Sequence, residues 1–86
     1  MNWELYIARS ARKQLKAIGR SDRKYILIAL KEMRADPFSG DVKWLKNQPH
    51  TFRRRVSAWR ILYDIDIPHR VILVGDIVRR ADNTYS

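Results

Sequence analysis

The chain has 86 residues, 45% of them hydrophobic, so it has room for a single domain, 1–86, with one modest core. It contains no cysteine, which excludes a disulfide framework and a thiolate metal site. Its net charge of +9 favours polyanionic partners such as nucleic acid. No apolar run approaches the roughly 18 residues that cross a bilayer, and no apolar signal region follows the first residues. We therefore expect a cytoplasmic protein with no membrane partner.

The N-terminal segment predicts a strand and then a helix. Residues 3–7 are aromatic and β-branched, as is typical of a strand. Ala11, Leu15 and Ile18 recur at helical spacing, which predicts an amphipathic helix that ends near Gly19.

A second helix follows, with Ile26, Leu30 and Met33 on one face. Ser21 is its expected N-cap, and Pro37 is expected to end it, because proline disfavours the helical conformation in the preceding residue. The short connection between the helices predicts an antiparallel helical hairpin.

Residues 38–51 have no clear period and contain Gly40 and Pro49. We expect an ordered loop here, with Val42, Trp44 and Leu45 packing it against the body of the domain. Loops of this length are often functional.

The remaining sequence predicts a β-meander with strands at 52–56, 59–65 and 70–78 and turns at 57–58 and 66–69. The expected order is β-α-α-β-β-β. This is an α+β fold: an N-terminal strand, an antiparallel helical hairpin and a three-stranded antiparallel meander, with the helices on one face of an antiparallel sheet.

Arginines cluster in the first predicted hairpin of the meander. Alternation along the strands places Ile61 and Tyr63 on the core face and Arg53, Arg55 and Arg60 together on the open face. Three guanidinium groups in one strip repel each other unless an anion lies across them. The strip therefore predicts a phosphate-binding surface, and the alternative is a solvated charged face.

Arg54 does not fit this pattern, because alternation places it with Phe52 and Val56 on the core face. Two explanations are open from sequence. Either residues 52–56 form an edge strand past which Arg54 extends to solvent, or a bulge resets the register.

Three stretches carry a family resemblance: residues 40–46 after Asp36 and Pro37, residues 52–63, and residues 79–85. They resemble the loop, the aromatic-Arg-x-Arg-Val hairpin and the closing Arg–Tyr element of the RelE/ParE toxin superfamily. The resemblance covers nearly the whole chain and includes the order of elements. Ser57 and Ala58 depart from it where glycine is common, and Arg54 departs from it where an apolar residue is common.

The resemblance implies a toxin of a type II toxin–antitoxin pair. RelE-like members cut mRNA on the ribosome by attack of the 2′-hydroxyl on the adjacent phosphate, which requires no metal and no cofactor. By position, Arg53, Arg55 and Arg60 would clamp the scissile phosphate and offset its developing charge. Arg80 would stabilise the leaving oxygen, and Tyr85 would orient or deprotonate the 2′-hydroxyl.

Further substrate contacts are expected from Lys43, Lys46, Arg54 and Arg79. Arg79 is also the alternative to Arg80 as the match for the tail arginine of the family. Related nucleases often carry lysine on the first hairpin strand, whereas this chain carries arginine. Arginine stays protonated at working pH and is a poor general base. Proton transfer would then depend on Tyr85.

The expected partners are a cognate antitoxin with an acidic or amphipathic segment, the ribosome and mRNA. One alternative on the same fold is a ParE-like toxin that inhibits DNA gyrase without catalysis. Another is an RNA-binding toxin relative with little activity. His50 and His69 lie in separate predicted loops, where we expect ordinary loop histidines, although His50 could touch substrate.

Overall fold

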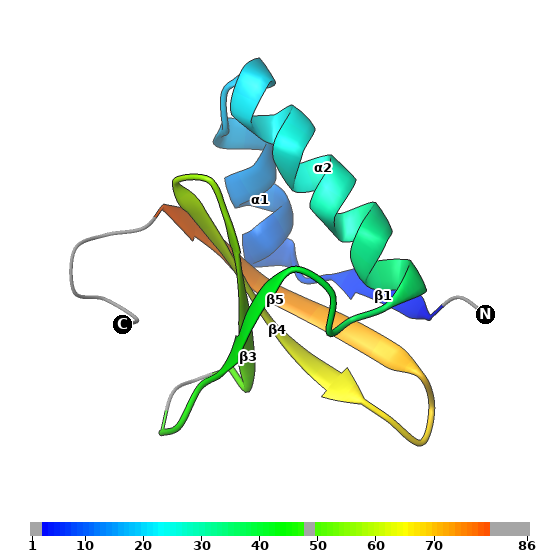
Figure 1. Cartoon of the computed structure of the whole chain (residues 1–86). Helices are drawn as coiled ribbons and strands as arrows, with labels where there is room; N and C mark the ends of the chain where they lie inside the picture. Colours follow the sequence, from blue (N-terminus) through cyan, green and yellow to red (C-terminus); the bar gives the residue numbers. More distant parts are fainter. Residues whose placement is uncertain (1–2, 48–49, 80–86) are drawn as a thin grey trace.

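Two helices pack on one face of a five-stranded sheet (Figure 1). The computed structural model describes residues 3–47 and 50–79. The elements, in chain order, are β1 (Glu4–Ile7), α1 (Arg9–Ala17), α2 (Arg20–Ala35), β2 (Asp41–Trp44), β3 (Phe52–Val56), β4 (Trp59–Asp66) and β5 (Val71–Arg79). The expected α+β class, helical hairpin and meander are confirmed.

The strands lie in the order β1-β5-β4-β3-β2. The three pairs from β2 to β5 are antiparallel, but β1 runs parallel to β5. The expectation of a purely antiparallel sheet is therefore wrong. A parallel pair needs a long connection between its strands. Here both helices and strands β2, β3 and β4 lie between β1 and β5 in the chain.

Strand β2 lies within the segment that was expected to be a loop. It pairs with β3, so that Val42 faces Arg54 and Lys43 faces Arg53. Leu45 is buried as expected, but Trp44 is 62% exposed and does not pack on the body of the domain. Because β2 is the outer strand, β3 is not an edge strand.

Helix α2 ends at Ala35, just before Pro37, as predicted. It begins earlier than expected, at Arg20, with Gly19 at the N-cap position and no side-chain cap. The prediction that Ser21 caps this helix is therefore wrong. Asp22 lies in the first turn, where a negative charge suits the helix dipole.

The core lies between the helices and the sheet. Ile61 and Tyr63 point toward the helices and are fully buried, as strand alternation predicted. The other core residues are Trp3, Ala11, Ile18, Ile26, Ala29, Leu30, Met33, Ile72, Val74 and Ile77. Neither helix is both long and apolar enough to cross a membrane in the described part of the chain.

Candidate functional site

Arg53, Arg55 and Arg60 come together on the sheet face opposite the helices, and we call these three residues the arginine face. Arg53 and Arg55 are two positions apart on β3, so both point away from α2. Arg60 on β4 lies directly across from Arg55. This is the grouping that the sequence predicted.

The arginine face is not a solvated surface. Arg53 and Arg60 are each only 7% exposed, and the Arg55 side chain is 37% exposed. Nε atoms of Arg53 and Arg55 are buried without a hydrogen-bond partner among the described residues. An unsatisfied buried donor costs about 1–3 kcal/mol, so an anionic acceptor at this site would be favoured.

Asp41 supplies a negative charge to this face. Nη1 of Arg53 donates to the main-chain oxygen of Asp41 at 3.1 Å and to its carboxylate at 3.3 Å. The same carboxylate lies 3.9 Å from Nε of Arg55. Asp41 therefore offsets part of the repulsion between the guanidinium groups. Asp41 was not among the predicted site residues, although the polar–apolar alternation of residues 41–44 is a signal for a strand.

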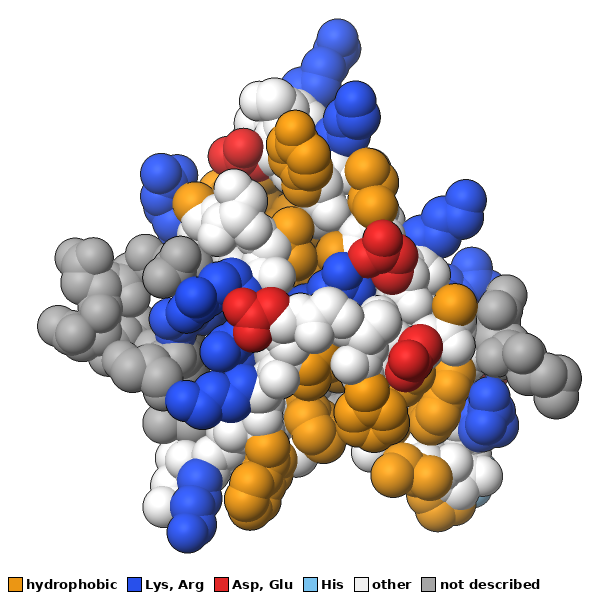
Figure 2. Space-filling view, in the orientation of Figure 1, with side chains coloured by type: hydrophobic (Ala, Val, Ile, Leu, Met, Phe, Trp, Pro, Cys, Tyr) orange, Lys and Arg blue, Asp and Glu red, His pale blue; other side chains and the backbone are white. Residues whose placement is uncertain are grey.

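Lysines extend the positive charge onto the edge of the sheet. Lys43 lies across from Arg53 on β2 and is exposed, and Lys46 is exposed just beyond that strand. Figure 2 shows basic side chains gathered around an acidic one over the β2–β3 side of the molecule. Both lysines remain candidates for substrate contact.

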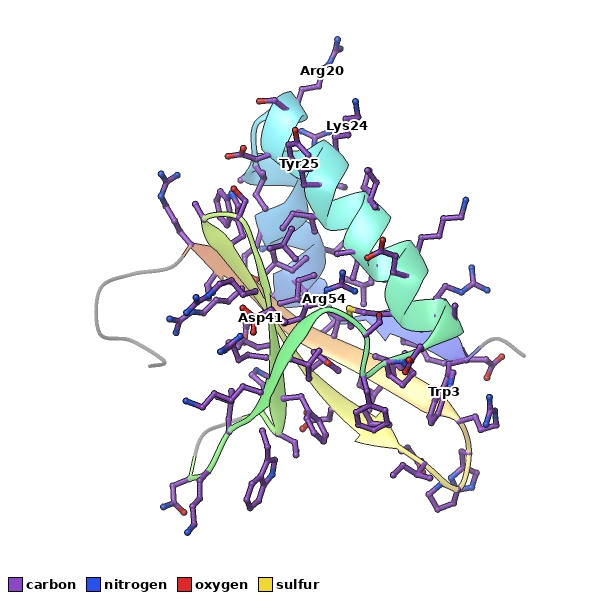
Figure 3. All side chains as sticks on the ribbon, in the orientation of Figure 1. Trp3, Arg20, Lys24, Tyr25, Asp41 and Arg54 are labelled. Atoms are coloured by element: carbon purple, nitrogen blue, oxygen red, sulfur yellow. The ribbon has the colours of Figure 1, made fainter. Side chains whose placement is uncertain are left out.

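Arg54 lies on the other side of the sheet, between α2 and β2 (Figure 3). Its guanidinium pairs with Glu32 and donates to the carbonyl of Ala29 and the hydroxyl of Ser39, both at 3.3 Å. Gly40 makes room for it, because a Cβ there would lie 2.7 Å from the guanidinium carbon.

The side chain of Arg54 is only 10% exposed. Both explanations for this residue, an edge strand and a bulge in β3, are wrong, because β3 pairs continuously with both neighbours. Arg54 is a structural ion pair on the helix side, which corrects the expectation that it contacts substrate.

Arg79 is also separated from the arginine face. Its guanidinium carbon lies 5.6 Å from the ring centre of Trp59, whose indole N–H donates to Asp22 of α2 at 3.1 Å. This contact is on the helix side of the sheet. The expected catalytic residues Arg80 and Tyr85 lie outside the described residues.

His50 is not an ordinary loop histidine, which corrects the expectation for this residue. Its Nε2 lies 2.8 Å from the carboxylate of Asp76, and its Nδ1 lies 3.5 Å from that of Asp64. Burial acts to raise the pKa of Asp64, but hydrogen bonds from Thr51 and His50 outweigh it and leave that pKa below 3.8. No local pattern could reveal this group, because its members come from distant positions. His69, by contrast, is exposed in a turn beside Asp66.

Tyr63 is not available for proton transfer at neutral pH. Its hydroxyl is buried on the core face and donates to the carbonyl of Pro37 at 2.8 Å. Burial raises the pKa of Tyr63 to about 12, although the charge of Arg54 opposes that rise. The described residues include no group of three or more His, Cys, Asp or Glu side chains placed to hold a metal ion.

Comparison with solved structures places this arrangement in a known fold. A chain of the archaeal RelE–RelB complex of Pyrococcus horikoshii is 18% identical over 95% of this chain and 99% of that chain, with a TM-score of 0.82. A chain of the Mycobacterium tuberculosis RelBE2 complex is 21% identical over 93% and 100%, with a TM-score of 0.80. The isolated Escherichia coli RelE toxin is 18% identical over 94% and 87%, with a TM-score of 0.78.

No family model matches the chain, and no curated protein matches its sequence. The likeness to solved structures therefore rests on shape. The matched structures are small α+β domains, as this chain is. The chain has the fold of the RelE toxins, and the match covers nearly the full length of both chains.

Proposed function

We propose that this protein is a RelE-like toxin of a type II toxin–antitoxin pair, and that its arginine face binds mRNA on the ribosome and promotes its cleavage. The observation that carries the proposal is the set of three guanidinium groups on one sheet face of a RelE-type fold. Guanidinium groups bind phosphate in a planar, bidentate way. The proposed site is cytoplasmic, where ribosomes and mRNA are found.

The proposed reaction is attack of a 2′-hydroxyl oxygen on the adjacent phosphorus. A new O–P bond forms, the bond to the 5′-oxygen of the next nucleotide breaks, and a cyclic phosphate is left. Negative charge grows on the phosphate oxygens during this step, and Arg53, Arg55 and Arg60 would stabilise it. They cannot remove the proton, since arginine stays protonated. Tyr85 in its ionised, phenolate form is the proposed acceptor of that proton, and Arg80 would stabilise the leaving 5′-oxygen, which takes up a proton from water.

The proposed partner is an antitoxin with an acidic, amphipathic helix. Helix α2 carries a shallow hollow of about 530 Å³ lined by Arg20, Arg23, Lys24, Leu27 and Ile28. Leu27 and Ile28 in this hollow and Tyr25 on the same helix are about half exposed. Arg20, Lys24 and Tyr25 project from this end of the helix (Figure 3). An apolar stripe with a basic rim suits a partner helix that has acidic flanks.

Inducing the protein in bacterial cells and mapping mRNA 5′ ends tests the function. New ends within translated codons are expected, and they should disappear in Arg60→Ala and Tyr85→Phe. Because Arg60 is buried and its removal could affect folding, Arg55→Ala serves as a second variant at a more exposed position. Lys13→Ala removes an exposed charge from α1 and should leave the cleavage pattern unchanged.

The same experiment separates the alternatives. Growth arrest with intact mRNA and accumulating DNA breaks would replace RNA cleavage with gyrase inhibition. RNA binding by the purified protein without new mRNA ends would indicate an RNA-binding relative with little activity.

A further inference from the structure

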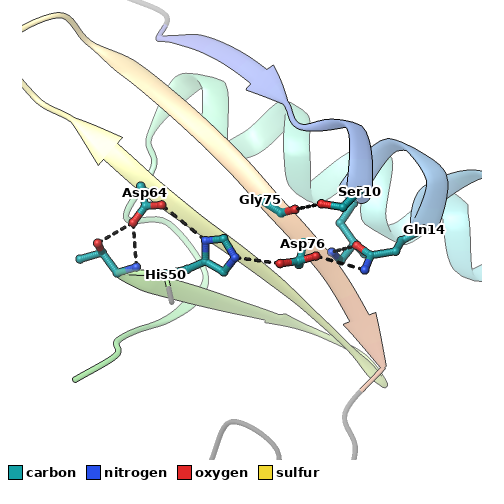
Figure 4. A network of polar contacts seen from close by, with 8 residues as sticks. Ser10, Gln14, His50, Asp64, Gly75 and Asp76 are labelled. Carbon is teal, nitrogen blue, oxygen red and sulfur yellow. Dashed lines mark hydrogen bonds and ion pairs between the residues drawn. The ribbon is translucent and has the colours of Figure 1, made fainter. Parts of the chain in front are cut away.

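A polar network ties the chain that enters β3 to the centre of the sheet and to α1 (Figure 4). We call it the His50 network; its members are Gln14, His50, Thr51, Asp64 and Asp76. His50 contacts both carboxylates, while Nε2 of Gln14 donates to Asp76 at 3.1 Å. The main-chain N–H and hydroxyl of Thr51 both donate to Asp64. Helix α1, strands β4 and β5 and the segment before β3 are therefore joined through side chains.

The charge state of His50 decides how many of these contacts form. Both ring nitrogens face carboxylate oxygens, and only the imidazolium carries an N–H on each nitrogen. A neutral ring would point one lone pair at a carboxylate. Because both nitrogens are engaged, this ring is suited to holding the chain rather than to transferring protons to a substrate.

Gly75 provides the seat for the imidazole ring. The register between β4 and β5 shifts at Leu62 and Tyr63, which leaves Gly75 as an extra residue of β5. A Cβ on Gly75 would lie 2.1 Å from Cε1 of His50. The hydroxyl of Ser10 on α1 donates to the Gly75 carbonyl at 2.7 Å. The bulge is thus held from α1 and filled by His50.

The His50 network lies beside the arginine face. Asp76 is in register with Leu62, and Leu62 is in register with Arg53. His50 itself is three residues before Arg53. His50 is therefore linked to the first residues of β3 in two ways: along the chain, and across the sheet through its contact with Asp76.

We propose that His50 is a positioning residue: as an imidazolium it fixes the start of β3 and thereby the guanidinium of Arg53. RNA binding should weaken at higher pH, because a ring without its second N–H cannot donate to both carboxylates. The part of this inference that concerns RNA rests on the proposed function, whereas the part that concerns Arg53 does not.

The groups that face His50 support this direction of change. The described charged groups against the ring are Asp64 on β4 and Asp76 on β5, and both are acidic. Gln14 of α1 and Thr51, the next partners in the network, do not titrate. Arginines and the phosphodiesters of RNA also keep their charge between about pH 6 and pH 8.

The test uses the full-length chain and two readouts. The first follows the side-chain Nε–H resonances of the arginines by NMR from about pH 6 to pH 8. The Arg53 signal should move together with the His50 ring signal, and it should not move in His50→Gln. In His69→Gln, which removes the exposed histidine of the 67–70 turn, the Arg53 signal should still move with His50.

The second readout is the affinity for a short fluorescein-labelled single-stranded RNA. Affinity should fall about fivefold over the same pH range, as expected for one lost hydrogen bond. In His50→Gln the affinity should be lower than in wild type and should not change with pH. In His69→Gln it should change with pH as it does in wild type. The inference would be wrong if the Arg53 resonance did not change over the pH range in which the His50 ring resonance changes. A coupled Arg53 signal without any RNA binding would support the positioning role and count against the proposed function.

Discussion

Arg53 is joined to Asp41 twice, because its Nη1 donates to both the main-chain oxygen and the carboxylate of that residue. Asp41 is therefore a built-in anion at the place where a phosphate oxygen is expected. A bound RNA must compete with it for the same donors.

Replacing Asp41 by asparagine should strengthen RNA binding. The change removes a negative charge beside Arg53 and Arg55 but keeps the size of the side chain. We expect affinity to rise about threefold to tenfold, which corresponds to the net contribution of one ordinary hydrogen bond. Fluorescence anisotropy with labelled RNA measures it. Asp66→Asn, which makes the same change at the end of β4 beside His69, is the control. Equal gains in both variants would show that the effect comes from net charge alone.

Arg55→Ala should lower both the affinity for RNA and its dependence on salt. Each lost phosphate contact reduces the slope of log affinity against log salt by about 0.7 for a single strand. Lys13→Ala removes the same charge from the exposed face of α1 and should leave the slope within error of wild type. An unchanged slope in Arg55→Ala would exclude this side chain from phosphate binding.

The ion pair of Arg54 and Glu32 should affect stability and not RNA binding. Glu32→Ala leaves the guanidinium buried without its counterion and should cost about 3 kcal/mol of unfolding free energy. Arg54→Met should cost less, about 1–2 kcal/mol, because Glu32 is half exposed and can be hydrated. Urea unfolding measures both values. A loss of RNA affinity in folded Arg54→Met would return Arg54 to the binding surface.

Gly75→Ala should reproduce the loss of His50. The new Cβ takes the space of the imidazole, so the ring must leave its two carboxylates. We expect each single variant, Gly75→Ala and His50→Gln, to lose about 1–2 kcal/mol of stability. The double variant should lose little more than one of them, because both act on the same contacts. Additive losses in urea unfolding would show that the two residues are not coupled.

Asp64 should make stability depend on acid pH. Its pKa is lower in the folded state than in the unfolded chain, so folding is favoured by its ionised form. This contribution is complete above the ordinary carboxyl pKa of about 4 and is lost as pH falls through the lowered pKa of the folded state. Thermal unfolding from neutral to strongly acidic pH should therefore show a smaller decrease in Asp64→Asn than in wild type. Parallel curves for the two proteins would contradict the assignment.

Much of the fold follows from periodicity in the sequence. Helical spacing located both helices, and strand alternation correctly separated Ile61 and Tyr63 from the arginine face. Strand β2 was not predicted, because it has only four residues and only one of them, Val42, is a half-buried apolar residue. A pattern this short gives a weak signal. The parallel pairing of β1 with β5 could not be predicted either, since no local pattern shows which distant strand a strand will pair with.

The site was predicted in its basic half and missed in its acidic half. The arginines lie close in sequence, so their grouping follows from one hairpin. Asp41 reaches the arginines through the register between β2 and β3. The carboxylates around His50 come together through the register between β4 and β5, which contains the bulge at Gly75. The role of Arg54 likewise depends on Glu32, which is contributed by a helix and not by the sheet.

The position of β5 also has a consequence for synthesis. This strand is the last element described, yet it lies between β1 and β4 and pairs with both. Until residues 71–79 have left the ribosome, β1 has no neighbour and the apolar surface of α1 has no sheet to cover. Pairing between strands that lie far apart in the sequence, such as β1 and β5, slows folding. We therefore expect a nascent chain that lacks β5 to be open to proteolysis, because only a chain that includes this strand can assemble its core.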